Sequence, residues 1–289
     1  MGYQNNVYAI KALRSGDRNA FKQEATILTK FADHRHTHRN LINLLGTFEH
    51  AGVFHFIFPL ANADLFDYWR RSEDPPDDED MDIWMIEQCR GLADGLNSVH
   101  RYATASGTAM LNAFDLNDRM GGRDQRSQPE SPGTSRPVRN FFGRHGDLKP
   151  ENILHYPCNQ STGRHGILKI TDFGVARFNT VDLWDTHKMG RLPNSATYRS
   201  PEIDLDGNLT TACDIWALGC VYLQFVTWYL GGNRLIEWFG QQRLERDPRM
   251  ANIPTDTFFS LYEERGERRA RVKPAVVKVS YLNSLYFVS

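Results

Sequence analysis

The most specific local signal in the chain is the run HGDLKPEN at residues 145–152, which continues into the apolar Ile153 and Leu154. Three other short strings accompany it: VYAIK at residues 7–11, DFG at residues 172–174 behind a β-type run, and SPE at residues 200–202. Any one of these strings arises easily by chance. All four in this order and at workable spacing are hard to explain as coincidence.

Composition and charge set the broad class of the protein. With 289 residues, 40% of them hydrophobic and 24% charged, the chain is an ordinary globular protein of one large domain or two small ones. Collagen-like, fibrous and fully disordered classes are excluded. The formal net charge is -1, so no general attraction to a polyanion is built in. Nucleic acid is therefore not expected as a partner.

Cysteine usage and hydropathy favour a cytoplasmic or otherwise intracellular protein. The four cysteines are too few and too scattered for the disulfide framework of a small secreted domain. Residues 1–15 lack the apolar core of a signal peptide. The most apolar run, residues 215–230, is shorter than the roughly 20 residues that span a bilayer. We expect it to be a buried core helix and expect no membrane partner.

Hydrophobic periodicity predicts a small sheet followed by a mainly helical part. A strand at residues 7–13 precedes a helix through residues 21–31, and the runs 41–48 and 53–58 predict an antiparallel hairpin. A short helix is expected at residues 65–70 and a core helix at 214–230. Between them, one apolar helix stripe is drawn by Met85, Cys89, Leu92, Leu96 and Val99. Residues 117–139 have almost no apolar side chains and predict a disordered surface insertion.

Together the four strings resemble the signature set of the eukaryotic-type protein kinase family: a strand lysine, a catalytic loop, a metal-binding DFG and an APE-like segment. The resemblance covers roughly residues 7–232 and implies an α+β, bilobal fold. Residues 1–61 are expected to form a small, incomplete β-rich N-lobe with the hinge, and residues 62–289 a mainly helical C-lobe. The DLKPEN form is similar to the serine/threonine branch, which places Lys149 near the transferred phosphate.

The resemblance implies a role for each polar residue of these motifs. Lys11 is expected to hold the α- and β-phosphates of ATP, and Glu24 to pair with Lys11. Asp172 and Asn152 are expected to hold two Mg²⁺ ions, and Asp147 to accept the proton of the attacking hydroxyl. Each residue alone has a structural alternative, such as a surface ion pair or a turn-capping aspartate. Taken together, the motifs favour the catalytic assignment.

The resemblance also places an adenine pocket beside the second strand of the hairpin. The segment at residues 56–61 resembles a kinase hinge, with Phe58 as the gatekeeper. Pro59 lacks an N–H group but keeps its carbonyl as an acceptor, and Ala61 offers both a donor and an acceptor. Ala9 and Leu154 are expected to sandwich the base. Simple core packing is the alternative for Phe58.

Structural roles are expected for several other residues by the same resemblance. His145 and Phe173 are similar to the buried side chains that, with Leu28, align the two lobes against Asp214. Thr197 resembles the threonine that contacts the catalytic aspartate when substrate binds, and a phosphorylation site is its alternative. The cluster of His34, His36 and His38, interleaved with arginine, predicts a solvated loop rather than a zinc site, and the acidic run at residues 77–82 a solvated helix start rather than a docking site for a basic substrate.

The sequence departs from the family pattern in three places. Gly146 replaces the arginine that usually precedes the catalytic aspartate, and no glycine-rich loop precedes Lys11. The arginine that pairs with the APE-type glutamate has no clear match, so Glu202 is expected either to be unpaired or to pair with an arginine between residues 265 and 271. Both ends therefore resemble those of a truncated kinase.

Two functions follow from these features. The first is a serine/threonine protein kinase that transfers the ATP γ-phosphate to hydroxyl groups of a protein substrate. The second is a catalytically weak or inactive kinase-like fragment that acts as a binding or scaffold module, which the missing glycine-rich loop favours. The sequence does not indicate an oligomeric state.

Overall fold

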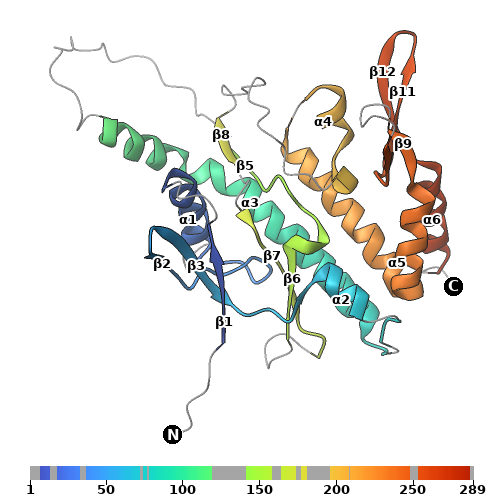
Figure 1. The fold of residues 1–289 in the computed structure, drawn as a ribbon, viewed down its shortest axis with the longest axis horizontal. Coiled ribbons are helices and arrows are strands. Elements are labelled where there is room, and N and C mark those ends of the chain that lie inside the picture. The colour runs from blue at the N-terminus through green and yellow to red at the C-terminus, as the bar shows by residue number, and fades with distance from the viewer. Residues whose placement is uncertain are drawn as a thin grey trace, which may run out of the picture.

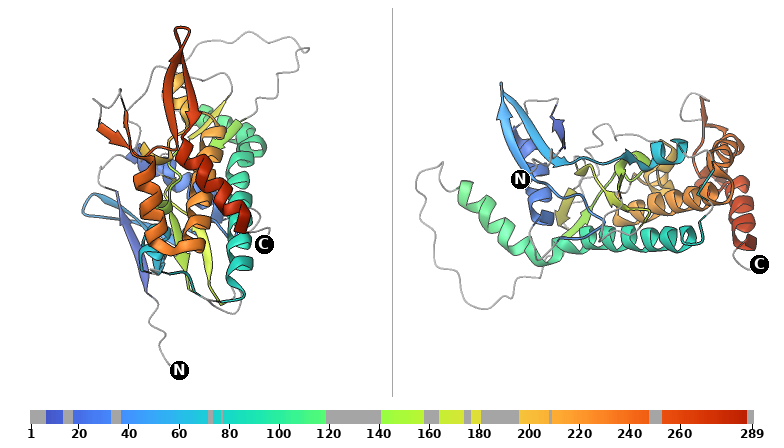
Figure 2. Two further views of the ribbon diagram at one scale, coloured as in Figure 1. Left: turned by 90° about the vertical axis from the view of Figure 1, so that its right-hand side faces the viewer. Right: turned by 90° about the horizontal axis from the view of Figure 1, so that it is seen from below.

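The computed structural model describes residues 7–13, 18–32, 37–71, 74–76, 78–118, 141–157, 164–173, 177–180, 196–207, 209–247 and 253–286. A small sheet with one helix lies at one end of the molecule, and the long helices extend toward the other end (Figures 1 and 2). The N-terminal region contains β1 (Tyr8–Ala12), α1 (Arg18–Ala32), β2 (Gly46–His50) and β3 (Val53–Pro59). The chain therefore has the predicted α+β organisation.

The N-terminal sheet is antiparallel, with strand order β1-β3-β2. Its register pairs Lys11 of β1 with Phe56 of β3. Helix α1 packs on the sheet through Phe21, whose ring stacks on that of Phe54 with 4.4 Å between the centroids. The predicted hairpin is shorter than expected, since its first strand begins only at Gly46. The preceding residues instead join the larger part, where the N–H of Ile42 donates to the carbonyl of Ile170 at 2.9 Å.

The C-terminal region is built around two long helices, α3 (Met81–Asp118) and α5 (Thr211–Arg243), which lie beside each other in all views (Figures 1 and 2). Helix α2 (Leu65–Arg71) precedes α3. Between α3 and α5 come short elements: β5 (Phe141–Arg144), a 3₁₀ turn (Pro150–Asn152), β6 (Ile153–Tyr156), β7 (Ile167–Ile170), β8 (Arg177–Thr180), a second 3₁₀ turn (Ala196–Tyr198) and α4 (Pro201–Leu205). Strand β6 pairs with both β4 (Ala63–Asp64) and β7, and β5 pairs with β8.

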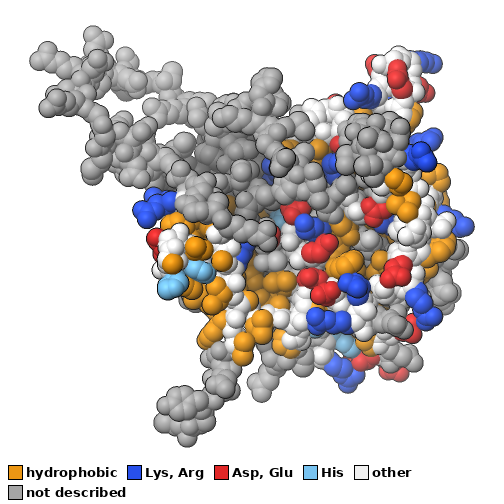
Figure 3. Space-filling view, in the orientation of Figure 1, with side chains coloured by type: hydrophobic (Ala, Val, Ile, Leu, Met, Phe, Trp, Pro, Cys, Tyr) orange, Lys and Arg blue, Asp and Glu red, His pale blue; other side chains and the backbone are white. Residues whose placement is uncertain are grey.

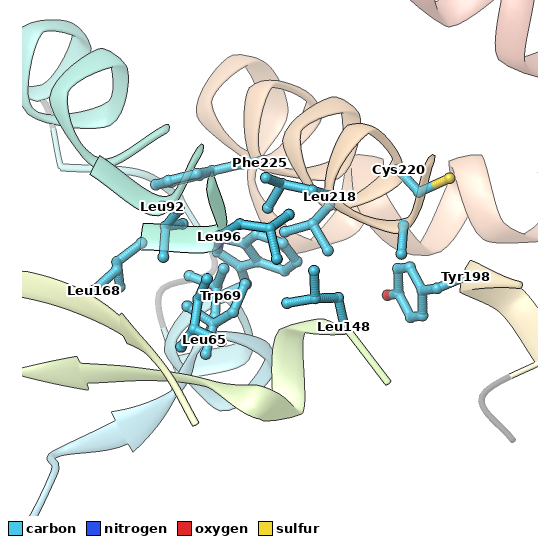
Figure 4. Packing of buried hydrophobic residues seen from close by; sticks show 14 of the residues in the cluster. Leu65, Trp69, Leu92, Leu96, Leu148, Leu168, Tyr198, Leu218, Cys220 and Phe225 are labelled. Carbon is cyan, nitrogen blue, oxygen red and sulfur yellow. The ribbon is translucent and has the colours of Figure 1, made fainter. Parts of the chain in front are cut away.

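The main core lies where α2, α3 and α5 meet the β6–β7 strands (Figure 4). The predicted stripe on α3 is confirmed: Met85, Leu92, Leu96 and Val99 are buried, and Cys89 is partly buried. Trp69 of α2 is buried against Phe225 of α5, with 5.8 Å between their ring centroids. Burial of such large apolar side chains supplies most of the driving force for folding, because each removes extensive apolar surface from water.

Helix α5 is longer than the expected helix over residues 214–230. Thr210 caps its N-terminus by accepting a hydrogen bond from the N–H of Ala212 at 3.1 Å. Gly231 and Gly232 have non-helical backbone angles, so the helix kinks there and continues to Arg243. By length and composition alone α5 would suffice to cross a membrane, but half of its most apolar stretch is buried inside the protein. It serves as the central core helix.

The segment after α5 combines short strands with one helix. It contains two antiparallel strand pairs, β9 (Glu245–Asp247) with β10 (Ile253–Thr255) and β11 (Phe259–Glu264) with β12 (Glu267–Val272), and then α6 (Pro274–Tyr286). The β11–β12 hairpin projects from the surface (Figures 1 and 2) and carries charges of both signs near its end (Figure 3). Helix α6 packs on α5 and buries Val276 and Val279.

The predicted insertion falls mostly on residues 119–140, which lie outside the described residues, although α3 itself continues to Asp118. Two members of the histidine cluster, His34 and His36, also lie outside the described residues. The third, His38, accepts a hydrogen bond from the N–H of Asn40 at 3.1 Å, and burial lowers its pKa. Among the described residues no group of three or more His, Cys, Asp or Glu side chains could hold a metal ion.

Candidate active site

Two distant parts of the chain meet at Lys11, which projects from β1. The Lys11 Nζ atom lies 2.7 Å from Glu24 Oε1 on α1 and 2.8 Å from Asp172 Oδ1, just after β7. The carboxylate of Glu24 is 5% exposed, whereas Lys11 and Asp172 are 37% and 44% exposed. A ligand can therefore reach both the Lys11 ammonium and the Asp172 carboxylate, while the buried Glu24 carboxylate holds the ammonium in place.

The charges around Lys11 keep it protonated. Burial alone disfavours an ammonium ion, but the neighbouring carboxylates of Asp172 and Glu24 outweigh burial and raise the pKa of Lys11 above its ordinary value. The ammonium group is thus a permanent positive charge at neutral pH. It is suited to binding anionic phosphate oxygens.

The loop at residues 145–152 brings three polar side chains together. Asn152 ends the 3₁₀ turn, and its Nδ2 donates to the carbonyl of Asp147 at 2.7 Å and to Asp147 Oδ2 at 3.1 Å. Lys149 Nζ lies 3.0 Å from the same Oδ2. The N–H of Thr171 donates to the Asn152 carbonyl at 2.9 Å, which ties this loop to the segment carrying Asp172.

Two backbone conformations shape the site. Asp172 has φ +64°, a left-handed conformation that aspartate tolerates better than most residues because its short polar side chain bonds locally. Gly146 has φ +86°, in the region that favours glycine. The replacement of arginine by glycine at this position therefore suits the local backbone.

The buried carboxylate of Asp214, on α5, orients the loop at residues 145–152. Asp214 accepts hydrogen bonds from the N–H groups of His145 and Gly146, each at 2.8 Å, and lies 2.9 Å from Nε2 of His100 on α3. The ring of His145 donates from Nε2 to the carbonyl of Thr171 at 2.8 Å. The side chain of Asp214 is 2% exposed, so it fixes the loop to the core helix α5.

The predicted alignment of buried side chains is present. The rings of Phe173 and His145 meet edge to face, with 5.1 Å between centroids, and both side chains are buried. Leu28 of α1 belongs to the same core cluster as Phe173. His100, which the sequence analysis did not single out, completes the contacts of Asp214. Its position directly after Val99, on the predicted apolar stripe of α3, is the feature of the sequence that could have indicated a buried role for His100.

The residues expected to surround adenine line the junction between the sheet and the C-terminal region. Ala9 pairs with Phe58 across β1 and β3, Phe58 is buried, and Leu154 and Ala61 pack on the main core. The carbonyl of Pro59 accepts a hydrogen bond from the hydroxyl of Tyr156 at 3.1 Å. Sequence reasoning did not identify this tyrosine.

The comparisons with known proteins agree on one family. Residues 142–232 match the family model described as protein kinase domain. The chain is 39% identical over 84 residues to cyclin-dependent kinase E-1 of Arabidopsis thaliana, which covers 29% of this chain and 17% of that protein. It is 41% identical over 85 residues to serine/threonine-protein kinase PDK1 of Cryptococcus neoformans, which covers 28% of this chain and 6% of that protein.

Residues 142–232 of this chain are thus similar to the eukaryotic-type protein kinase family. The glycogen synthase kinase-3 homolog YGK3 of Saccharomyces cerevisiae is a further relative, 42% identical over 78 residues, or 27% of this chain and 18% of that protein. The chain spans less than a fifth of the length of these three relatives. The matched kinase segment contains the catalytic loop and Asp172 but neither Lys11 nor Glu24, and it is the fold that brings these two residues to it.

The structure decides between the two alternatives for Glu202 and gives Thr197 a partner that was not expected. Glu202 Oε2 is buried without a hydrogen-bond partner, and in the described parts of the chain no ion pair joins Glu202 to arginines 265–271. Arg269 instead pairs with Glu264 of its own hairpin at 2.9 Å. The hydroxyl of Thr197 donates to Asp256 Oδ1 at 2.5 Å, a contact that no local pattern predicted.

Proposed function

We propose that this chain is a serine/threonine protein kinase, which transfers the γ-phosphate of ATP to a hydroxyl group of a protein substrate and uses Mg²⁺. The observation that carries the proposal is the convergence of Lys11, Glu24 and Asp172 within 2.8 Å contacts, next to the loop that holds Asp147. A structural ion pair on β1 would not need a second carboxylate from the other region of the fold.

The proposed chemistry needs positioning and charge neutralisation more than covalent work by the protein. Lys11 would bind the α- and β-phosphates, since its charge is held in place by the buried Glu24. Its bond to Asp172 closes the site from the C-terminal side and orients that carboxylate. Lys149, 3.0 Å from Asp147, would neutralise charge on the transferred phosphate.

Asp147 is the proposed acceptor for the proton of the attacking hydroxyl. Its carboxylate is fixed by Asn152 and Lys149, and its backbone N–H donates to Nδ1 of His145 at 3.3 Å. The loop is fixed in turn by Asp214 below it. An oriented carboxylate beside a lysine can accept a proton from a substrate hydroxyl while that hydroxyl attacks the phosphate.

The donor set fits ATP with magnesium. Asp172 and Asn152 offer a carboxylate and an amide oxygen, the hard oxygen ligands that Mg²⁺ takes in addition to phosphate oxygens. Asn152 uses its Nδ2 group toward Asp147, so its Oδ1 atom is the one suited to a cation. Bound Mg²⁺ would neutralise charge on the phosphates. The proposed adenine contacts are Ala9, Phe58, Pro59, Ala61 and Leu154.

The proposed division of the chain follows the site. Residues 1–61 would form a partial N-lobe with Lys11, α1, the hairpin and the hinge. Residues 62–289 would form the helical C-lobe, including the insertion at about 117–139. Ligand would then lie between the region that supplies Lys11 and the region that supplies Asp147.

A transfer assay tests the proposal. Labelled ATP, Mg²⁺ and a histone mixture are incubated with the wild-type chain and with Asp147→Asn. We expect phosphate on histone serine or threonine with the wild-type chain and a loss of at least about 100-fold in the variant, since the proton acceptor is gone. Equal signal from the two proteins would refute the enzyme proposal.

A binding module without turnover is the second candidate, and the free edge of β1 favours it. In the described part of the chain β1 is an outer strand of its sheet, and Tyr8 and Ile10 are exposed there. Apolar side chains gather on this part of the surface (Figure 3). ATP-dependent thermal stabilisation without any phosphate transfer would support this candidate over the enzyme.

A further inference from the structure

The segment that precedes α4 is held by a residue far beyond the part of the chain that matches the kinase model. Thr197 lies in the 3₁₀ turn Ala196–Tyr198, and its hydroxyl donates to Asp256 Oδ1 at 2.5 Å. The matched part ends at residue 232, and Asp256 lies just after β10. A hydroxyl bonded to a carboxylate at this distance is a strong, charge-assisted hydrogen bond.

Asp256 is itself fixed by a buried cation. Arg243, at the end of α5, donates from Nε to the Asp256 carbonyl at 3.0 Å, and its Nη2 lies 3.8 Å from Asp256 Oδ2. The Arg243 side chain is 1% exposed, and its guanidinium lies over the rings of Phe239 and Phe258, at 4.0 and 4.2 Å from their centroids. Two aromatic faces and one carboxylate hold the guanidinium in a single position.

A second buried cation, Lys273, holds the backbone next to Asp256. Lys273 is buried, and its Nζ donates to the carbonyls of Arg243, at 2.6 Å, and Thr255, at 3.1 Å. The carboxylate of Asp256 therefore has little freedom to follow Thr197. If one partner of this hydrogen bond moves, it is the turn that carries Thr197.

The same turn has a second anchor, which lies on α5. Tyr198, the next residue, already anchors the turn to α5, because its buried hydroxyl donates to Gln224 Oε1 at 2.7 Å. The bond from Thr197 is partly buried, with the Asp256 side chain 37% exposed. It fixes the direction of the Thr197 hydroxyl and joins the turn to the segment after β10.

We propose that Asp256 is a positioning residue for the protein substrate, acting through Thr197. By accepting the hydroxyl proton, Asp256 orients Thr197 and holds the turn at residues 196–198 in the conformation that receives the substrate segment around the phosphorylated residue. The part of the chain after α5 thus contributes to the substrate site through Asp256. This inference rests on the proposed kinase function.

The test combines hydrogen exchange with kinetics on the full chain. The variants are Asp256→Asn, which keeps an acceptor but removes the charge, Thr197→Val, and the double variant. Glu245→Gln is the matched control, because Glu245 lies 3.9 Å from Lys273 in the same part of the chain and its carboxylate accepts from Ser260, not Thr197. Amide exchange is followed over residues 196–205, and KM is measured for a histone mixture and for ATP.

Because a neutral hydrogen bond is about half as strong as a charge-assisted one, Asp256→Asn should raise both the exchange rate and the histone KM about threefold. Loss of the whole bond in Thr197→Val should raise them about tenfold. The KM for ATP should not change. In the Thr197→Val background, Asp256→Asn should have no further effect, since its target is gone.

Several outcomes would overturn the inference. Exchange over residues 196–205 that is the same in Asp256→Asn as in Glu245→Gln would show that the carboxylate does not hold the turn. Additive effects in the double variant, or faster exchange with an unchanged histone KM, would reduce the contact to a structural one. If the wild-type chain transfers no phosphate, the proposed function fails, and equal exchange would then still refute the contact separately.

Discussion

Replacing Lys11 with methionine tests the central contact of the site. Methionine keeps most of the side-chain volume of lysine but removes the charge, so Glu24 is left as a carboxylate that is 5% exposed and has lost its cation. Breaking a fully buried ion pair in this way costs about 3–5 kcal/mol. Lys11 and Asp172 are each more than a third exposed, so solvent screens part of the interaction and the expected loss is about 2 kcal/mol.

The loss is measurable by thermal unfolding. A decrease of about 2 kcal/mol in the free energy of unfolding lowers Tm by about 5 °C in a protein of this size. Phosphate transfer should fall about 100-fold, the usual effect of removing one preorganised group that stabilises charge in the transition state. Lys22→Met, at an exposed position on α1, is the matched control and should change neither quantity.

A second substitution isolates the buried carboxylate. Adding Glu24→Gln to Lys11→Met removes the uncompensated charge, so the double variant should recover most of the lost Tm while it stays inactive. A double variant no more stable than Lys11→Met would refute the electrostatic reasoning. An active Lys11→Met variant would refute the assignment of Lys11 to the phosphates.

Two further predictions concern buried groups. Asp214→Asn should lower the free energy of unfolding by about 3 kcal/mol, because an amide NH₂ group would face at least one N–H donor of the loop; a loss below about 1 kcal/mol in urea titration would contradict it. Burial lowers the pKa of His155, whose ring packs on Tyr68 at 4.6 Å, so the unfolded state protonates first as the pH falls. The free energy of unfolding should therefore drop below about pH 6.5 more steeply in the wild type than in His155→Phe, and parallel pH profiles would argue against this.

The local elements could be predicted from sequence because each has a periodic apolar pattern. The stripe on α3 and the strand with Lys11 are both at the predicted residues. The apolar run after residue 214 correctly indicated a core helix. Its continuation past Gly231 was missed, since two consecutive glycines normally end a helix and here only kink it.

The long-range contacts of the site divide into two kinds. The meeting of Lys11 with Glu24 was expected because it belongs to a recognisable motif set, and the structure has it at 2.7 Å. The contact of Thr197 with Asp256 depends on how the chain folds after residue 232, where no motif and little periodicity exist. Short polar strands such as β9 and β10 have no apolar alternation, so their pairing could not be inferred.

The kink in α5 influences the position of residues that lie well beyond it in the chain. Gly232 has φ +65° and ψ −166°, a combination that is essentially restricted to glycine. The direction that the chain takes after this residue determines where Arg243 arrives, and Arg243 in turn anchors the acceptor for Thr197. We therefore expect Gly232→Ala to disturb the turn at residues 196–198, although residue 232 does not belong to that turn. Gly232 thus determines the direction of the second half of α5. In a scan of single substitutions, we expect changes at Gly232 to inactivate the protein as strongly as changes at the charged site residues.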